Sequence, residues 1–439
     1  MTKPVSNLST EELQESLRGL QAELQRRQPK IEGWRWEEAL EAPLLSQAYE
    51  AKQRFLLEMS SAETNEPKPC PDCGRPIKVK ARRSRTIQSL RGKHSFLRNY
   101  HHCGKCKHGF YPMDAALGLS AKGDLSPRME SLVLDLGAAT SYQEAAHQFE
   151  LHHRVAISKT MVAGVVDRAG VVWNETSISK RTELREIPKN AAQTLVAQVD
   201  DSFLRTREKD ETWKASRLGL VYNHEDRVNK SRAEILRTSY VGHLSNSEAF
   251  EAEFRAVLEA HRADQTPTVL WVADGSAFNW NLQQRLVPKA VPILDFFHVA
   301  EHLGDASEAL FGLDVKSKRR WMKTAKTLLL HRSVRAFFEW LETQPARFAK
   351  QYKKLSALGD LSRYLERHRD RMHYRRYRRR GWPIGSGAIE SGHKTIFQLR
   401  MKRPGQRWDL TKGQNLAQIR AIRASVGAEN LYDTIRKAA

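Results

Sequence analysis

Four cysteines, all within a short stretch of the chain, are the first residues whose spacing indicates chemistry. Cys70 and Cys73 form one C-x2-C pair, and Cys103 and Cys106 form a second pair 29 residues later. Each pair brings two thiolates to one ion, and two pairs complete the tetrahedral ligand set of a structural zinc. Four thiolates leave no position for water, so catalytic zinc is not expected, and thiol redox chemistry is the weaker alternative. The clustering also favours a metal site in a reducing compartment over a disulfide framework.

Three acidic residues stand where apolar runs or a glycine-rich turn expose them. Asp200 ends the run LVAQVD, Asp274 ends VLWVAD, and Glu390 follows GWPIGSGAI. Mg²⁺ or Mn²⁺ prefers oxygen ligands, and two such ions about 3.5–4 Å apart serve both the attacking and the leaving oxygen in phosphodiester chemistry. Taken singly, each residue has a plainer interpretation, because an Asp at a strand end is commonly a cap. Taken together, the three carboxylates predict a two-metal site.

A second acidic position lies at the end of the next apolar run, VPILDFF. Asp295 is followed three residues later by His298. The histidine is a candidate to contact scissile DNA or to orient a carboxylate. The alternative is that it is structural, as most isolated histidines are.

The elements that must position these carboxylates begin near residue 190. The runs TLVAQVD, RLGLVYN and AEILRTSYVG predict three strands, followed by a helix at 246–261. TVLWVAD predicts a fourth strand, FNWNLQQRL a helix and VPILDFF a fifth strand. This β-β-β-α-β-α-β order is that of an RNase H-like fold, and if the first and fourth strands are neighbours, Asp200 and Asp274 lie side by side. Residues 299–380 are polar and helical, which predicts an all-helical insertion before the helix that carries Glu390.

Helical segments also precede the strands. The N-terminus reads as an amphipathic helix, either packed on its own chain or paired in a short coiled coil. Three short helices at about 127–138, 142–150 and 158–169 predict a helix-turn-helix-like unit, with a purely structural three-helix unit as the alternative. The candidates for DNA contact in the third helix are Lys159, Thr160 and Arg168.

The whole chain is strongly basic. Among its 439 residues Lys and Arg number 73 and Asp and Glu 51, which gives a net charge of +22. A partner with regularly spaced negative charge explains that excess, and double-stranded DNA is favoured over a ribosome-associated or merely cationic role. Towards the C-terminus the residues expected to contact DNA are Arg375, Arg376, Arg378, Arg379, Arg380, Lys394, Arg400, Lys402 and Arg403.

The sequence predicts a multidomain α/β protein without a membrane partner. No stretch approaches the roughly 18 apolar residues of a membrane helix, and the N-terminus lacks the apolar core of a secretory signal. A cytoplasmic, nucleoid-associated protein is therefore expected. The expected parts are an N-terminal helical region (1–60), a zinc ribbon (65–120), a helix-turn-helix-like unit (125–172), the first part of an RNase H-like catalytic core (190–298), the helical insertion (299–380) and a catalytic helix with a basic tail (381–439).

The motifs, taken in order, resemble those of a known family. The runs CPDCG, LRNYHHCGKC, YPMDAALGL, VDDSF, WVADGSAFNW, ILDFFHVAEHL and GSGAIESGHKTIFQLRMKRPGQRW are similar to those of the Kra-type bacterial insertion-sequence transposases, relatives of the Mutator-like and hAT-like DDE enzymes. The resemblance covers about residues 65–425. It implies a DDE triad on the three acidic residues named above, an auxiliary D-x2-H motif at Asp295 and His298, and a helical insertion before Glu390.

The resemblance also implies a function. The expected enzyme is a Mg-dependent DDE transposase that binds terminal inverted repeats, cleaves the DNA strand and transfers it to target DNA, acting as a homodimer or larger assembly. The alternatives are a non-catalytic, sequence-specific DNA-binding protein derived from a transposase, and an RNase H-like nuclease that cuts without joining. Such transposases carry Asp-Gly at the first triad position, whereas Asp200 is followed here by Asp201. Asp200 continues the strand and is the expected first ligand, with Asp201 as the alternative.

Overall fold

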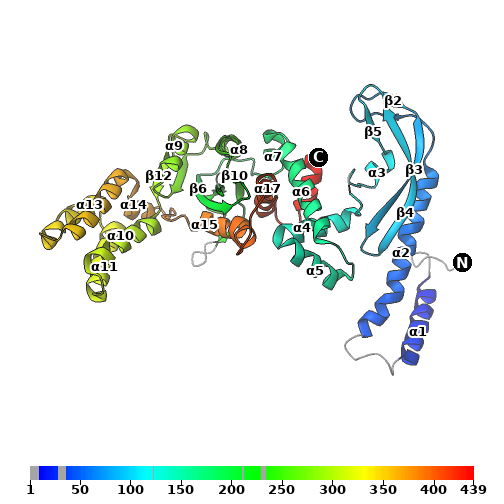
Figure 1. The fold of residues 1–439 in the computed structure, drawn as a ribbon, viewed down its shortest axis with the longest axis horizontal. Coiled ribbons are helices and arrows are strands. Elements are labelled where there is room, and N and C mark those ends of the chain that lie inside the picture. The colour runs from blue at the N-terminus through cyan, green and yellow to red at the C-terminus, as the bar shows by residue number, and fades with distance from the viewer. Residues whose placement is uncertain (1–8, 28–35, 122, 210–211, 229–233) are drawn as a thin grey trace. The chain divides into compact units, whose positions relative to one another are not determined.

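Two compact units make up the chain (Figure 1). One consists of residues 1–136 with 143–165, and the other of residues 137–142 with 166–439. The computed structural model describes residues 9–27, 36–121, 123–209, 212–228 and 234–439, so parts of the predicted N-terminal helical region, 1–8 and 28–35, lie outside the described residues. Within the described ranges, no helix is both long enough and apolar enough to cross a membrane.

The first unit opens with two helices and a small antiparallel sheet. Its first elements are α1 (Thr10–Arg27), α2 (Trp36–Ala62), β1 (Lys68–Pro69), β2 (Pro76–Ile77), β3 (Val79–Ser89), β4 (Gly92–Cys103), β5 (His108–Phe110) and α3 (Pro112–Ala116). The strands β3 and β4 form a long hairpin, and β5 adds a third strand to β4. The strand-like stretches predicted between the two cysteine pairs are therefore present as a hairpin.

A small apolar core and a buried ion pair hold this hairpin in place. The core residues are Leu56, Ile87, Phe96, Met113 and Leu119. Beside the core, the buried carboxylate of Asp114 in α3 accepts a hydrogen bond from Arg85 at 2.6 Å and also pairs with Arg98. A buried carboxylate is tolerated only when it is paired, so this ion pair fixes α3 against the hairpin.

Three helices follow where the sequence predicted them. They are α4 (Pro127–Ala139), α5 (Tyr142–His153) and α6 (Lys159–Glu175). Pro127 opens α4, a position where its missing N–H costs nothing. The Ser158 hydroxyl caps α6 by accepting a hydrogen bond from the Met161 N–H at 3.1 Å. Their predicted role in reading DNA stays a prediction.

A five-stranded mixed sheet forms the centre of the second unit. Its strands are β6 (Thr194–Arg205), β7 (Trp213–Asn223), β10 (Ser239–Leu244), β11 (Thr268–Ala273) and β12 (Val291–Leu294). The spatial order is β10-β7-β6-β11-β12. The first two pairings are antiparallel, and β11 lies parallel to both β6 and β12. The predicted adjacency of the first and fourth strands, β6 and β11, is confirmed. The predicted third strand, AEILRTSYVG, is divided: Glu234–Ile235 belongs to a separate two-stranded sheet, and only the part from Ser239 onward joins the five-stranded sheet as β10.

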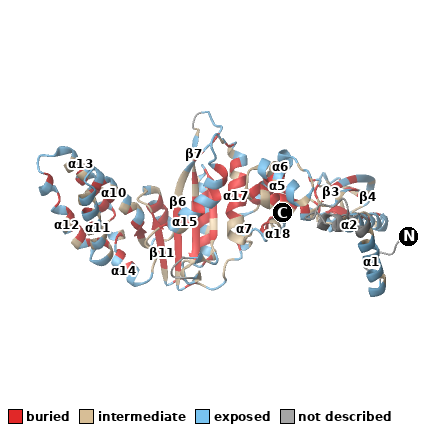
Figure 2. Ribbon diagram, turned by 90° about the horizontal axis from the view of Figure 1, so that it is seen from below, coloured by how far each residue is buried: buried red, intermediate tan, exposed pale blue. Residues whose placement is uncertain are grey.

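Helices cover both faces of this sheet. On one face, α8 (Ser247–Ala260) packs its Phe254 ring against Gly219, 2.6 Å from where a Cβ would stand. On the other face, α15 (Gly387–His393) packs against Leu218, and α17 (Leu410–Val426) runs along β10. Figure 2 shows buried residues concentrated in the sheet strands and in α17. Further elements of this unit are α7 (Ile178–Glu183), the short strands β8 (Arg227–Val228) and β9 (Glu234–Ile235), α9 (Ala277–Leu286), a π-helical turn (Lys394–Gln398), α16 (Leu399–Met401) and α18 (Leu431–Ala438).

Between β12 and α15 the chain is helical, as the sequence predicted for residues 299–380. The helices are α10 (Phe296–Phe311), α11 (Val315–His331), α12 (Val334–Glu342), α13 (Tyr352–Arg367) and α14 (Tyr374–Arg379). All of this segment is described, and it contains no strand. The Phe296 N–H donates to the Ile384 carbonyl at 2.8 Å. This main-chain hydrogen bond therefore joins the two ends of the helical insertion next to the sheet.

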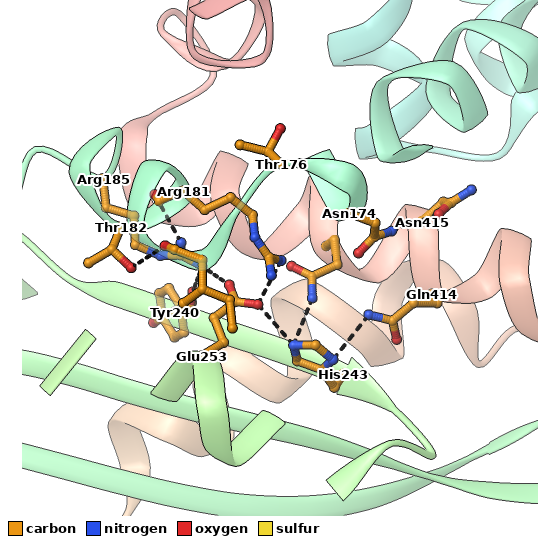
Figure 3. A network of polar contacts seen from close by, with 12 residues as sticks. Asn174, Thr176, Arg181, Thr182, Arg185, Tyr240, His243, Glu253, Gln414 and Asn415 are labelled. Carbon is orange, nitrogen blue, oxygen red and sulfur yellow. Dashed lines mark hydrogen bonds and ion pairs between the residues drawn. The ribbon is translucent and has the colours of Figure 1, made fainter. Parts of the chain in front are cut away.

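A fully buried acid, Glu253 of α8, lies at the centre of a polar network in this unit (Figure 3). Its carboxylate accepts hydrogen bonds from Arg181 at 2.8 Å and Arg185 at 2.6 Å. A carboxylate oxygen also lies 3.0 Å from His243 Nε2. Burial alone would raise the pKa of Glu253, but the two arginines and the histidine hold that pKa well below its usual range. The network fixes α7, which carries Arg181, against α8 and β10.

We expect Glu253→Gln to lower the free energy of unfolding by about 3–5 kcal/mol, because it leaves two buried guanidinium groups without their counter-charge. Urea denaturation of the full chain measures this. The control is Glu251→Gln on the same helix, which removes pairs with Arg255 and Arg285 at the solvent edge and should cost less than about 1 kcal/mol. Equal losses of unfolding free energy in the two variants would show that the buried contacts of Glu253 stabilise the fold no more than the exposed pairs of Glu251 do.

Candidate active site and metal centre

The four cysteines lie together in the first unit. Cys70 and Cys73 flank the turn between β1 and β2, Cys103 ends β4, and Cys106 follows in the turn before β5. Their sulfur atoms all lie within 4.8 Å of one another, and no disulfide joins them. A hydrogen bond from the backbone N–H of Cys106 lowers the pKa of the Cys103 thiol to about 7. This donor set fits a closed, structural zinc site in which all four residues are ligands.

A second candidate site lies in the second unit where β11 ends beside the middle of β6. Val272 of β11 pairs with Gln198 of β6, so Asp274 and Asp200 follow at the same level, two residues further along each strand. β11 ends at Ala273, whereas β6 continues past Asp200 to Arg205, so Asp200 does not end its strand as the sequence suggested. The register nevertheless brings the first two predicted carboxylates side by side.

The Asp274 carboxylate also organises the turn that follows its strand. Its Oδ1 accepts hydrogen bonds from the Ser276 N–H at 2.9 Å and from Asn279 Nδ2 at 2.8 Å. The plainer interpretation of this residue as a turn cap is thus correct for one oxygen. The other oxygen makes no hydrogen bond within the described part of the chain, which leaves it free to bind an ion.

Two polar side chains hold α15 over the same face of β6. The Gln198 side-chain oxygen accepts a hydrogen bond from the backbone of α15 at 3.0 Å. His393 Nε2 lies 2.8 Å from the Asp200 carbonyl, and its Nδ1 lies 3.3 Å from the Ser202 hydroxyl. Burial lowers the pKa of His393 to about 4, so the ring is neutral and donates from Nε2. These contacts attach the helix that carries Glu390 to the strand that carries Asp200.

The three carboxylates interact electrostatically. Burial raises the pKa of Asp200 to about 7, and the like charges of Asp274, Asp201 and Glu390 contribute to that rise. Among the described residues, only the cysteines form a group of three or more potential ligands whose atoms all lie within 4.8 Å of one another. The carboxylate oxygens of Asp200, Asp274 and Glu390 therefore do not all lie within that distance of one another.

The two adjacent aspartates of β6 point to opposite faces of the sheet. Asp201 stands directly opposite Arg217 of β7, whose Nε lies 3.4 Å from its carboxylate. Burial raises the pKa of Asp201 to about 6, while Arg217 lowers it. Asp200 is on the other face, under α15. The side of the strand that faces Glu390 therefore carries Asp200, whereas Asp201 is engaged in an ion pair.

Asp295 is buried and contacts protein groups rather than open space. Its Oδ1 caps α10 by accepting from the Phe297 N–H at 2.7 Å, and its Oδ2 accepts from the Ser386 N–H at 3.2 Å and from the Ser386 hydroxyl. The same hydroxyl lies 2.6 Å from Glu390 Oε1. Within the described residues, Asp295 contacts the candidate site through Ser386, whose single hydroxyl proton can be donated to only one of the two acids at a time.

His298 lies close to Tyr364, whose hydroxyl packs against Gly275, the residue after Asp274. Its Nδ1 is 3.3 Å from a carboxylate oxygen of Glu301, and its ring packs edge-on against His302 with centroids 4.9 Å apart. No contact in the described residues joins it to Asp200, Asp274 or Glu390. Its predicted contact with scissile DNA stays a prediction.

Sequence reasoning missed several residues that build this site. Ser386 and His393 lie four residues before and three after Glu390, a helical spacing that could have identified them. Gln198 lies two residues before Asp200 on the same strand face, which is also a readable signal. Tyr364 of α13 offered no readable signal, because its partner Gly275 is far away in the sequence. The Tyr364 hydroxyl packs against Gly275, 2.4 Å from where a Cβ on that glycine would stand.

Most of the basic residues predicted to contact DNA are exposed in the second unit. Those on and after α14 are Arg375, Arg376, Arg378, Arg379 and Arg380, and those after α15 are Lys394, Lys402 and Arg403. Four of the arginines line a groove of about 500 Å³. Burial lowers the pKa of Lys402 and the charge of Asp200 raises it, which puts this lysine within electrostatic reach of the carboxylates. On α6, Lys159 and Thr160 are exposed and Arg168 is half-buried.

The prediction that Arg400 contacts DNA is wrong. Its side chain is only 1 % exposed. The guanidinium lies 4.6 Å from the ring centroid of Tyr142 and 5.2 Å from that of Trp408. A guanidinium held between two aromatic rings stabilises the packing of the core. The sequence did not reveal this role, because Arg400 stands within a run of basic residues.

The fold and these two sites define a mixed α/β protein with a four-cysteine centre and a separate acidic centre. The chain belongs to the family described as "Uncharacterised protein family (UPF0236)", which matches residues 74–427. A similar relative is the "UPF0236 protein in vanSb 3'region" of Streptococcus gallolyticus, 25 % identical over 338 residues that cover 76 % of this chain and 71 % of the relative. Among solved structures, the Drosophila P element transposase strand transfer complex is similar at a TM-score of 0.34 and 9 % identity, covering 71 % of this chain and 95 % of that one. A structural likeness that distant supports no argument about this chain.

Cys70→Ser should reduce bound zinc from about one ion per chain to nearly none, because a three-thiolate remainder no longer closes the tetrahedral site. Elemental analysis of the purified chain measures the ion. Limited proteolysis should then cut the first unit faster while the second unit persists. Asp72→Asn, in the same turn, keeps all four thiolates and should retain the zinc. Retention of zinc by Cys70→Ser would refute the site.

Arg400→Ala and Arg403→Ala should have opposite signatures. The first removes a buried side chain and should cost about 1–3 kcal/mol of stability. The second removes an exposed charge, should change stability by less than about 0.5 kcal/mol, and should lower the salt slope of DNA binding by about 1. Thermal unfolding and binding titrations at several salt concentrations test the pair. A stable Arg400→Ala protein with a reduced salt slope would restore Arg400 as a DNA contact.

Proposed function

We infer that this protein is a DDE-type DNA transposase. In this proposal Asp200, Asp274 and Glu390 hold two Mg²⁺ or Mn²⁺ ions in an RNase H-like core. The single observation that carries it is the approach of these carboxylates from β6, β11 and α15. Burial, together with the like charges of Asp274, Asp201 and Glu390, raises the pKa of Asp200 to about 7. Acidic side chains that lie close together without a basic partner repel one another and destabilise the fold. Such an arrangement is typical of a site that binds cations.

The topology supports the proposal. The three antiparallel strands β10, β7 and β6 are followed in space by β11 and β12, parallel to β6. This is the arrangement of an RNase H-like sheet, with the first and fourth strands at its centre. A helical insertion between the fifth strand and the helix that carries the third carboxylate agrees with the sequence resemblance to Kra-type transposases.

The chemistry follows from the charge of the substrate. Divalent ions, when bound, would activate the attacking oxygen and stabilise the leaving oxygen of a phosphodiester. The protein's own groups hold the ligands in place: Ser386 orients Glu390, while His393 fixes α15 against the main chain of Asp200. Water attacks the phosphodiester at a transposon end and releases a 3′-hydroxyl. That hydroxyl then attacks a target phosphodiester, forming one bond as another breaks.

Binding to double-stranded DNA belongs to the same proposal. The net charge of +22 and the exposed arginines of and after α14 supply phosphate contacts. The zinc ribbon and the three-helix unit are proposed to recognise terminal inverted repeats. Joining two ends requires that they be held together, so a homodimer or larger assembly on DNA is expected.

Asp274→Asn should retain binding to terminal repeats but lose Mg²⁺-dependent cleavage by at least about 10³-fold, because an amide oxygen carries no charge to hold the ion. The readout is gel mapping of nicked and joined products from the flanking repeats. Asp264→Asn, an exposed aspartate upstream of β11, is the matched control and should cleave normally. Normal cleavage by Asp274→Asn would exclude the triad. Binding without cleavage by the unmodified chain would favour a non-catalytic DNA-binding protein, and nicking without joining would favour a nuclease.

A further inference from the structure

A cavity of about 860 Å³ opens on the sheet face beside α15. One wall is formed by residues spaced along that helix and the following turn: Gly387, Ala388, Ser391, Gly392 and Thr395. Glu390 lies off this stripe and does not line the cavity. The helix that carries the third carboxylate thus presents a different side to a separate, accessible space.

The cavity is lined by cations and aromatic rings. Arg227 of β8 and Arg378 of α14 are its charged lining residues, and the described lining contains no Asp or Glu. Aromatic side chains come from separate elements: Phe297 of α10, which is 60 % exposed, Trp382 before α15, and Tyr240 of β10. A net positive, aromatic-lined space favours a ligand that is anionic and carries a flat ring.

Glycines let these rings form smooth walls. A Cβ on Gly385 would stand 2.6 Å from the Phe297 ring, and a Cβ on Gly392 would stand 2.6 Å from the Tyr240 ring. The two rings therefore rest directly on the backbone of the glycine-rich turn and of α15. This close packing keeps the rings in place at the cavity wall without help from a ligand.

The cavity is also connected to the candidate active site. Gln198 and Gly385 both line it. The Gln198 side-chain oxygen accepts from the backbone of α15, and its amide nitrogen lies 3.5 Å from the Gly385 carbonyl. Ser386, which orients Glu390, is the next residue. A ligand in the cavity would therefore touch the turn that sets the third carboxylate.

We propose that this cavity binds a single unpaired nucleotide of a DNA strand, with the base against Phe297, Trp382 and Tyr240 and the phosphate between Arg227 and Arg378. The proposal rests on the proposed function, because it takes DNA as the substrate. Its volume suits one nucleotide. A base paired within a duplex cannot reach an aromatic wall, so the nucleotide has to be unstacked. The cavity holds a strand that is opened close to the site of cleavage.

The test measures binding alone, with the full chain in EDTA so that no cleavage occurs. The probes are a single-stranded oligonucleotide carrying one 2-aminopurine, the matching duplex, and free dAMP. We expect the double variant Arg227→Ala/Arg378→Ala to weaken single-strand binding by about 10- to 100-fold, the loss expected when charged hydrogen bonds to one phosphate are removed, with a much smaller effect on the duplex. The unmodified chain should quench 2-aminopurine, and the double variant should not.

Two further variants keep the test decisive. Arg375→Ala/Arg379→Ala removes two exposed charges of the same helix outside this cavity and should weaken single strand and duplex alike. Thr238→Trp fills the cavity without removing charge and should reproduce the selective loss. Parallel losses in all variants would overturn the proposal, as would displacement of the oligonucleotide by dAMP at similar concentration, which indicates a free-nucleotide site. Failure here leaves Mg²⁺-dependent cleavage untouched, whereas failure of the triad leaves this binding intact.

Discussion

Repulsion between carboxylates is the constraint that the second unit is built to withstand. Asp200 lies within β6, Asp274 follows the last residue of the neighbouring parallel strand β11, and α15 carries Glu390 towards both. No strand pairing favours that concentration of charge, so other contacts have to impose it. Gln198 and His393 attach α15 to β6. The Ser386 hydroxyl contacts Glu390 and also the buried carboxylate of Asp295. Most polar contacts around the site can be understood as restraints on groups that repel one another.

Two acids of this chain show what the restraint achieves. The buried Glu253 is surrounded by Arg181, Arg185 and His243, and the pKa of its carboxyl is held well below the usual range. Asp200 is half-buried among acids, and the pKa of its carboxyl is raised to about 7. The first arrangement stabilises the folded chain, whereas the second opposes folding. Under the proposed function, a bound cation would offset that repulsion.

The sequence allowed the strand order to be predicted because each strand of the sheet is a short apolar run bounded by turn signals, as in LVAQVD and VLWVAD. The cysteine pairs were equally readable, since thiolate spacing is local. Burial of a charged residue was not: Arg400 lies in a basic run, and only the rings of Tyr142 and Trp408, distant in sequence, reveal that it is packed inside. The contact of Tyr364 with Gly275 was hidden for the same reason. Local chemistry can be read from spacing, whereas a partner supplied by tertiary packing cannot.

The joined ends of the insertion have a consequence for how such proteins diversify. Phe296 and Ile384 share a main-chain hydrogen bond, and Asp295 binds Ser386. The two ends of the insertion are therefore held together beside the sheet. The entropy of closing a loop grows only slowly with its length. The helical insertion can therefore be extended, shortened or exchanged, by evolution or by design, without moving the candidate site. The contacts between its two ends keep Asp200, Asp274 and Glu390 in the same arrangement. Any replacement has to supply a ring that seats on Gly275 as Tyr364 does.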